Sequence, residues 1–451
     1  MNKKKKQKIV RYSITASVVV LFVIAIIISI FTKDLEAVQF EQKRNTDVME
    51  FNPFIENERR LDNSFLEYGK VLFKYLSAGY PLYKGNPLEL RGMDYIPEKS
   101  TINSDVKAFT EAYVVDGEVV LEADPTAVVT STSKVTLVYN LDVPETALYN
   151  LELVYGLFSG KSANMLIGLT INGKQPFIES SYFEVRRMYE FYDFDKYDDE
   201  GNQIRAKQRE VFGWQKAVLT HPGGFYRNPY LILLQKGTNS IEISFSREAG
   251  VIKTISFVAP TVNPTYEEYL NMNGFSEDKI YKGEAKQIEL EVPVLKNDIT
   301  LRSEWNDDYY SYPPSYDLLR YNTFGGSRWK DGGTGAKWTF EVPETGWYQL
   351  SFRYSTPLTY VAAYREIKID GAIPFEDLEE YCFPYSDGWV LRPLMDKDQK
   401  PFMFYLEEGT HEIEITAKVG PLRHDIQRIE ECIESISSLV RRITQLVAAT
   451  R

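Results

Sequence analysis

One seven-residue pattern occurs twice in this chain. The first copy is Val143-Pro-Glu-Thr-Ala-Leu-Tyr149, and the second, 199 residues later, is Val342-Pro-Glu-Thr-Gly-Trp-Tyr348. Each copy stands between two stretches in which apolar and polar residues alternate, and this alternation is typical of a β-strand half buried on a core. Because strand, turn and strand recur in the same order, the pattern indicates two copies of one domain.

A second pair of matching strings supports the repeat: Ile171-Asn-Gly-Lys-Gln-Pro-Phe177 and Ile369-Asp-Gly-Ala-Ile-Pro-Phe375. Asn-Gly and Asp-Gly supply the positive φ angles of a tight hairpin turn, so we expect Gly173 and Gly371 in such turns. Neither copy contains a long amphipathic helical pattern. Short strands separated by turn residues predict a mostly β chain with two tandem jelly-roll β-sandwiches.

The chain divides into six predicted segments. In order they are a basic tail with a transmembrane helix (1–32), a stalk or packing helix (33–82), the first sandwich (83–263), a linker (264–280), the second sandwich (281–421) and an amphipathic, coiled-coil-like helix (422–451). The first sandwich also carries an insertion at about residues 180–210, for which we predict a hairpin that turns at Gly201 and Asn202.

The first 31 residues predict a membrane anchor. Six Lys and Arg residues precede an apolar run of 18 residues at positions 14–31, which is near the lower limit for crossing a bilayer. No small-residue cleavage site follows the run, so we expect it to be retained. The positive-inside rule then predicts a single-pass protein of the cell membrane, with its N-terminus in the cytoplasm and its bulk outside.

Charge and reactive side chains exclude several classes of function. The net charge is −12, and it is −18 without the basic first 31 residues, so nucleic acid is not an expected partner. Two cysteines are too few for a disulfide framework, and three histidines stand near no triad motif. We therefore expect no enzyme. Two alternatives remain: a non-catalytic subunit or fragment of a glycan-degrading enzyme, since a glycosidase needs only two carboxylates and the chain has 64 acidic residues, and a structural spacer without ligand.

Aromatic residues outside the alternating strands are candidates for ligand contact. A sugar ring has an apolar face and hydroxyl edges, so a flat aromatic ring next to an amide or carboxylate can hold it. The alternative for each aromatic residue is packing in a sandwich core. The candidate sugar-binding residues are Trp214, Phe225, Tyr226, Tyr321, Asn322, Trp329, Tyr360 and Trp389.

The order of these segments resembles a family of large, membrane-anchored extracellular solute-binding proteins of bacterial carbohydrate ABC transporters. The two pairs of strings above carry the resemblance, together with Leu319-Arg-Tyr-Asn-Thr-Phe-Gly-Gly-Ser-Arg-Trp329 and Gly420-Pro-Leu before a helix. The resemblance implies an anchor, two galactose-binding-like sandwiches, an oligo- or polysaccharide ligand, and an ABC transporter or solute-binding partner. The family's solute-binding domain has no counterpart here, so the resemblance does not extend to transport capture itself.

Two glutamates are candidates for a structural calcium site. Sandwich modules that bind sugars often hold one Ca²⁺ with carboxylates of the first strand, and Glu289 and Glu291 stand at that place in the second copy. We expect no other cofactor. The acidic stretch at 193–202 lacks the spacing of a calcium loop, because its glycine stands at position nine instead of six.

The last segment has apolar residues at alternating intervals of three and four. These are Ile426, Ile429, Ile433, Ile436, Val440, Ile443 and Val447. A helix with such a stripe needs a partner surface. Self-association, docking on another chain, and truncation of a longer protein all remain open.

Overall fold

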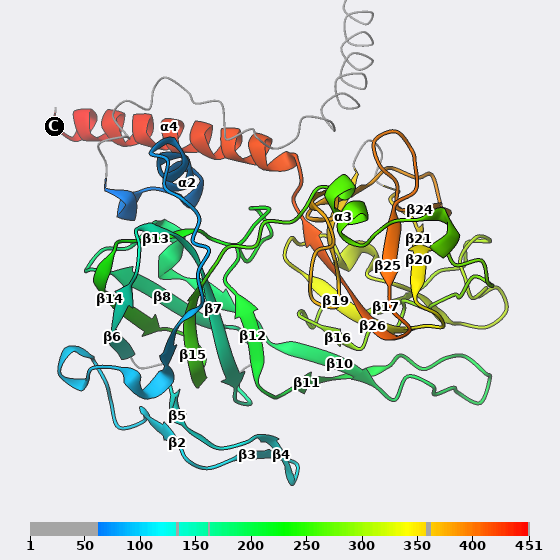
Figure 1. The fold of residues 1–451 in the computed structure, drawn as a ribbon, viewed down its shortest axis with the longest axis horizontal. Coiled ribbons are helices and arrows are strands. Elements are labelled where there is room, and N and C mark those ends of the chain that lie inside the picture. The colour runs from blue at the N-terminus through cyan, green and yellow to red at the C-terminus, as the bar shows by residue number, and fades with distance from the viewer. Residues whose placement is uncertain (1–61, 132–134, 161–162, 358–361, 450–451) are drawn as a thin grey trace, which may run out of the picture. The chain divides into compact units, whose positions relative to one another are not determined.

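The computed structural model describes residues 62–131, 135–160, 163–357 and 362–449. These residues form antiparallel sheets with few helices, as the sequence predicts (Figure 1). Within these ranges no helix combines the length and the apolar character needed to cross a membrane. The predicted anchor at 14–31 lies outside the described residues, and so does Tyr360.

The first repeat is a β-sandwich around one hydrophobic core. Its larger sheet has the order β12-β7-β15-β5-β2, with β1 on β15 and β13 on β7, and its smaller sheet has the order β6-β14-β8-β9. Inward side chains of both sheets form one buried cluster. The strands are β1 (Leu88–Arg91), β2 (Lys107–Phe109), β3 (Tyr113–Val115), β4 (Glu118–Leu121), β5 (Asp124–Val129), β6 (Val135–Val143), β7 (Ala147–Leu157), β8 (Met165–Ile171), β9 (Phe183–Val185), β10 (Met188–Tyr192), β11 (Lys207–Val211), β12 (Gln215–Val218), β13 (Ile232–Leu234), β14 (Gly237–Phe245) and β15 (Gly250–Val258).

The second repeat has its own core, built in the same way. Its main sheet contains β16-β19-β26-β22-β23, and three short ladders, β17-β18, β20-β25 and β21-β24, complete it. The strands are β16 (Leu295–Lys296), β17 (Ser303–Trp305), β18 (Tyr321–Phe324), β19 (Gly335–Val342), β20 (Gly346–Gln349), β21 (Ser351–Tyr354), β22 (Ala363–Ile369), β23 (Tyr381–Phe383), β24 (Val390–Pro393), β25 (Met403–Leu406) and β26 (Gly409–Lys418).

The repeated Pro-Glu-Thr string makes the same turn in both repeats. In the first, the turn takes the chain from β6 in one sheet to β7 in the other. The hydroxyl of Thr146 accepts a hydrogen bond from the Lys236 amide at 2.9 Å, and the hydroxyl of Thr345 accepts one from the Glu408 amide at the same distance. The threonine thus ties the turn to the residue just before β14 in the first repeat and just before β26 in the second.

The glycine turns are also as predicted. Gly173 and Gly371 both have a φ of 78°, and the preceding Asn172 and Asp370 both have a φ of 51°. Two successive positive φ angles define the primed turn that Asn-Gly and Asp-Gly favour. The insertion likewise turns at Gly201, whose φ is 85°.

Three α-helices accompany the sheets within the described ranges. Helix α2 (Tyr68–Ser77) packs Tyr68, Val71 and Tyr75 into the first core. Helix α3 (Tyr266–Met272) begins after a capping box of Thr265 and Glu268 in the linker. Helix α4 (Leu422–Ala449) is the predicted last segment. Along α4, Ile429, Ile433 and Ile436 are 58–61% exposed, so the identity of any partner of this stripe remains a prediction.

The insertion makes a connection that the sequence did not predict. Strands β10 and β11 form a hairpin, and β10 pairs with β16 of the second repeat through Tyr189 and Lys296. The main sheet of the second repeat therefore continues into the hairpin, in the order β11-β10-β16-β19. This hairpin belongs to the first repeat by sequence and to the second by hydrogen bonding.

Candidate functional site

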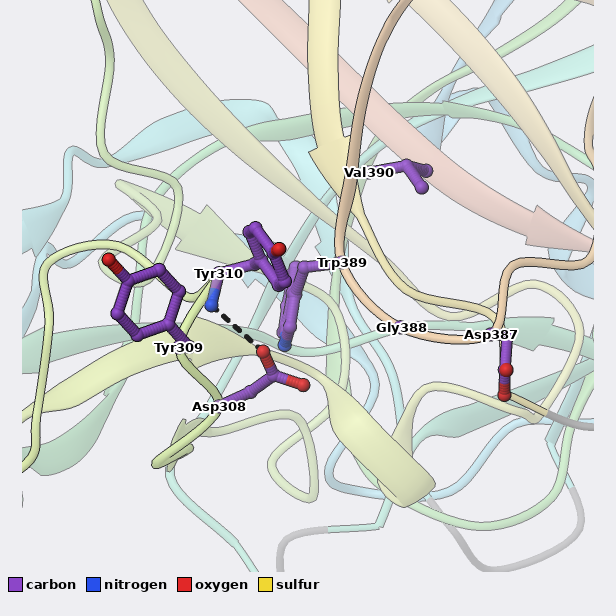
Figure 2. A pocket seen from close by; sticks show the side chains of 7 residues that line it. All are labelled: Asp308, Tyr309, Tyr310, Asp387, Gly388, Trp389 and Val390. Carbon is purple, nitrogen blue, oxygen red and sulfur yellow. Dashed lines mark hydrogen bonds between the residues drawn. The ribbon is translucent and has the colours of Figure 1, made fainter.

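A pocket of about 510 Å³ lies on the second repeat. Its wall comes from the loop between β17 and β18, from the loop between β23 and β24, and from the first residue of β24 (Figure 2). The residues that line it are Asp308, Tyr309, Tyr310, Asp387, Gly388, Trp389 and Val390. Rings and carboxylates thus share one opening, which is the combination expected for a ligand with apolar faces and hydroxyl edges.

The aromatic side chains of the first loop are exposed instead of buried. Tyr309 is 76% exposed and Tyr310 is 66% exposed, and Tyr312 and Tyr316 are also exposed. The rings of Tyr309 and Tyr316 stack with their centroids 6.0 Å apart, and the ring of Tyr310 meets that of Tyr309 edge-on at 5.4 Å. Exposed apolar surface gathered in one place commonly marks a binding site.

Asn322 on β18 organises this loop. Its side-chain oxygen accepts a hydrogen bond from the Asn306 amide at 3.0 Å. Its NH₂ group donates toward the carbonyl oxygens of Asn306 and Pro313 and toward the hydroxyl of Ser311, at 2.7–3.1 Å. Asn322 is only 4% exposed, so its amide is fully used inside the protein. The predicted ligand residue is therefore a buried support for the residues that line the pocket.

Asn306 connects this loop to Trp389 by a hydrogen bond. Its side-chain oxygen accepts from the Trp389 indole nitrogen at 3.2 Å and from the Asp308 amide at 3.0 Å. The Asp308 carboxylate in turn accepts from the Tyr310 amide at 2.8 Å, the bond drawn in Figure 2. Asn322 and Trp389, 67 residues apart in the chain, are thus joined through one asparagine.

Other candidate residues of the second repeat lie elsewhere. Trp329 packs against the second core, its indole nitrogen donates to the Thr334 carbonyl, and the Arg365 guanidinium lies 4.9 Å from its ring centroid. Tyr321 starts β18, and the Arg205 guanidinium lies 5.0 Å from its ring centroid. Neither ring lines the pocket.

The candidates of the first repeat contact the protein itself. Trp214 packs against a small cluster that includes Phe109, with Lys253 Nζ 5.2 Å from its ring centroid. Tyr226 packs on the first core, and its hydroxyl accepts from the Gly69 amide and faces Glu179. Burial raises the pKa of Tyr226 well above its ordinary value.

Phe225 belongs to the same packed segment. Its ring centroid lies 5.6 Å from that of His221, and the His221 Nδ1 accepts from the Gly223 amide. Burial lowers the pKa of His221 to about 4, so the ring stays neutral at ordinary pH. In the described part of the chain the ring of Trp214 contacts Phe109 and neither Phe225 nor Tyr226, so the three do not form one platform.

Glu289 and Glu291 lie before β16 and not on a strand, contrary to the sequence expectation. Burial, and then the neighbouring Glu289 carboxylate, raise the pKa of Glu291 to about 8. Across the described ranges, no group of three or more His, Cys, Asp or Glu side chains is placed to hold a metal ion. Two carboxylates are a small part of the six to eight oxygens that calcium takes. The pair by itself therefore does not fit a calcium site.

Sequence reasoning missed Tyr309, Tyr310, Tyr312 and Tyr316. A signal was present, since the stretch Asp307-Asp-Tyr-Tyr-Ser-Tyr312 is rich in aromatics and does not alternate as a strand does. Such a run between turn residues is better interpreted as an exposed loop than as core.

No family model matches this sequence, and no curated protein matches it either. Among solved structures, a family 35 carbohydrate-binding module from Clostridium thermocellum aligns at 13% identity over 39% of this chain and 99% of its own, with a TM-score of 0.23. The β-(1,4)-mannanase of Podospora anserina aligns at 15% identity over 40% of this chain and 29% of its own, also with a TM-score of 0.23.

A Paenibacillus cycloisomaltooligosaccharide glucanotransferase aligns over more of this chain. The identity is 10%, the alignment covers 78% of this chain and 50% of the enzyme, and the TM-score is 0.23. At such identities and scores, these similarities assign neither a ligand nor an activity to this chain.

Proposed function

We propose that this chain is a non-catalytic carbohydrate-binding protein whose binding surface is the aromatic pocket of the second repeat. The observation that supports this proposal is the gathering of the exposed Tyr309 and Tyr310 rings and the half-buried Trp389 ring with two carboxylates around one opening. Pyranose rings stack on such aromatic faces, and carboxylates accept hydrogen bonds from sugar hydroxyls.

The proposal includes a place in the cell. The apolar run at 14–31 would anchor the chain in the membrane, and two galactose-binding-like jelly rolls would display glycan outside it. By the family resemblance, the chain would hold an oligo- or polysaccharide near the membrane in association with a sugar ABC importer.

A glycoside hydrolase is the competing function. Asp308 and Asp387 line the same pocket, and glycosidases use two carboxylates on either side of the scissile bond. Binding and cleavage are separated by measuring both in the same samples.

The test is calorimetry on the full-length chain, kept in a detergent without a sugar head group. Mannohexaose, xylohexaose and isomaltohexaose serve as ligands. We expect Trp389→Ala to weaken binding about 30-fold, since an aromatic residue at the centre of a binding surface contributes about 2 kcal/mol. Trp389→Phe keeps an aromatic ring and should retain most of the affinity.

Tyr182→Ala is the matched control, because Tyr182 is an exposed aromatic of the first repeat, 42% exposed, and lines no part of the pocket. It should bind as the wild type does. A wild-type chain that binds none of these glycans would refute the proposal. Release of reducing ends, lost in Asp308→Asn, would show the hydrolase instead.

A further inference from the structure

The tip of the β10–β11 hairpin contacts the segment that follows the aromatic loop. The Gln203 amide donates to the Leu319 carbonyl at 2.9 Å, and the Asn202 side-chain oxygen accepts from the Leu319 amide at 3.1 Å. The Gln203 side-chain oxygen accepts from the Tyr321 amide at 2.8 Å. Backbone groups of the second repeat are therefore satisfied by a hairpin of the first.

Arg320, between these two residues, adds side-chain contacts to the hairpin. Its guanidinium donates to the Gly201 carbonyl at 2.7 Å and lies 4.8 Å from the ring centroid of Tyr197. From the hairpin side, the Arg205 guanidinium covers the ring of Tyr321. Three successive residues, 319–321, are thus held from the same hairpin.

The base of the hairpin is fixed separately. Lys296 on β16 is fully buried, and its ammonium group donates to the Gln208 side chain and to the carbonyl of Leu301. It also lies 4.9 Å from the ring centroid of Phe191 on β10. The hairpin is thus held at its base and at its tip, and it can support the segment at residues 319–321 that it contacts.

The contacts continue from residues 319–321 into the pocket wall. The Arg320 amide donates to the Ser315 hydroxyl oxygen, which also accepts from the Trp305 indole nitrogen. The neighbouring Tyr316 stacks on Tyr309 and donates its hydroxyl hydrogen to the Tyr309 carbonyl at 3.0 Å. Tyr309 lines the pocket.

We infer that the β10–β11 hairpin of the first repeat is a positioning element of the second repeat's binding surface, with Asn202 and Gln203 as its positioning residues. The two repeats then form one binding unit, in which the first orders the loop that presents the rings. This inference rests on the proposed function for its ligand, but its structural part can be tested without one.

The test compares the full-length wild type with Asn202→Ala/Gln203→Ala, which removes both side-chain acceptors. Hydrogen exchange should become about tenfold faster in residues 305–321, since two amides lose their partners. Affinity for the hexaose that the wild type binds should fall about tenfold. Gln203→Glu retains the acceptor for the Tyr321 amide, so this single change should keep the loop ordered and the affinity near wild type.

Arg209→Gln is the matched control, because Arg209 lies on the same hairpin and pairs with Glu190 at the exposed surface. It should change neither readout. Unchanged exchange and affinity in the double variant would overturn the inference, and so would equal losses in Arg209→Gln. If the double variant does not fold, Gln203→Ala alone is measured against the same criteria.

A wild-type chain that binds no hexaose would refute the proposed function, but it would not refute the structural part of the inference, which is that the hairpin orders the aromatic loop. In that case the exchange rates decide, since faster exchange at residues 305–321 in the double variant supports the inference and unchanged exchange overturns it. Faster exchange with unchanged affinity would overturn the positioning role.

Discussion

Asn322→Ala should destabilise the second repeat, because the Asn322 amide is buried and hydrogen-bonded to the loop before it. The side chain is 4% exposed and satisfies the Asn306 amide and the carbonyls of Asn306 and Pro313. The NH₂ group has two hydrogens, so it makes at most two full bonds among its three acceptors. Three net hydrogen bonds at about 1 kcal/mol each give a loss of about 3 kcal/mol in the free energy of unfolding.

The measurement is urea denaturation of the full-length chain, followed by tryptophan emission. Asn322→Asp retains the acceptor for the Asn306 amide, but it loses the donors and places a buried carboxylate oxygen against two carbonyl oxygens, so it should lose more than about 2 kcal/mol. Exposed Asn228→Ala is the matched control and should lie within about 0.5 kcal/mol of wild type. A loss below about 0.5 kcal/mol for Asn322→Ala would refute the role of the amide in ordering the loop.

Three further predictions test the turn, the acidic pair and the core. Gly371→Val should cost about 1 kcal/mol or more in thermal unfolding, because a β-branched residue is poorly tolerated at a φ of 78°; an unchanged melting temperature would contradict this. The pKa of Glu291 is raised from 4.5 to about 8 in the folded protein, so the protonated carboxyl favours the folded state. Its contribution to the free energy of unfolding is complete below pH 4.5 and is lost as pH rises through 8, with a slope of up to about 1.4 kcal/mol per pH unit between these values. Glu291→Gln should remove this fall, and restoration of wild-type stability by Ca²⁺ at pH 8 would instead show that the pair takes metal. Trp329→Ala should lower the free energy of unfolding in urea by about 3 kcal/mol, because the ring packs on the second core. Full stability together with lost glycan binding would instead show that Trp329 contacts the ligand.

The elements that the sequence predicted correctly depend on local rules. Gly173 and Gly371 follow Asn and Asp, and the turn that these dipeptides favour needs little from the rest of the chain. A local rule also accounts for α3 in the predicted linker, since it begins at a capping box in which Thr265 and Glu268 stand three residues apart. The twin Pro-Glu-Thr strings add redundancy, because any alternation seen in one copy could be checked against the other.

The site could not be predicted in the same way, because its residues are defined by what other segments leave exposed. Trp329 and Trp389 are both tryptophans in loops, yet one packs on the second core and the other lines the pocket. The difference comes from Asn306, whose side chain holds the Trp389 indole and whose own backbone is held by Asn322. The residues next to each tryptophan in the sequence do not indicate which of the two contacts Asn306.

The hairpin shows the same limit across a longer distance. Its strands alternate as any hairpin does, but the pairing of Tyr189 with Lys296 and of Gln203 with Leu319 joins parts of the chain more than 100 residues apart. Two repeats of one domain would be expected to fold and bind separately. Here the hairpin of the first repeat contacts residues 319–321, which follow the aromatic loop of the second. Under the inference above, the insertion would therefore make the two repeats one binding unit.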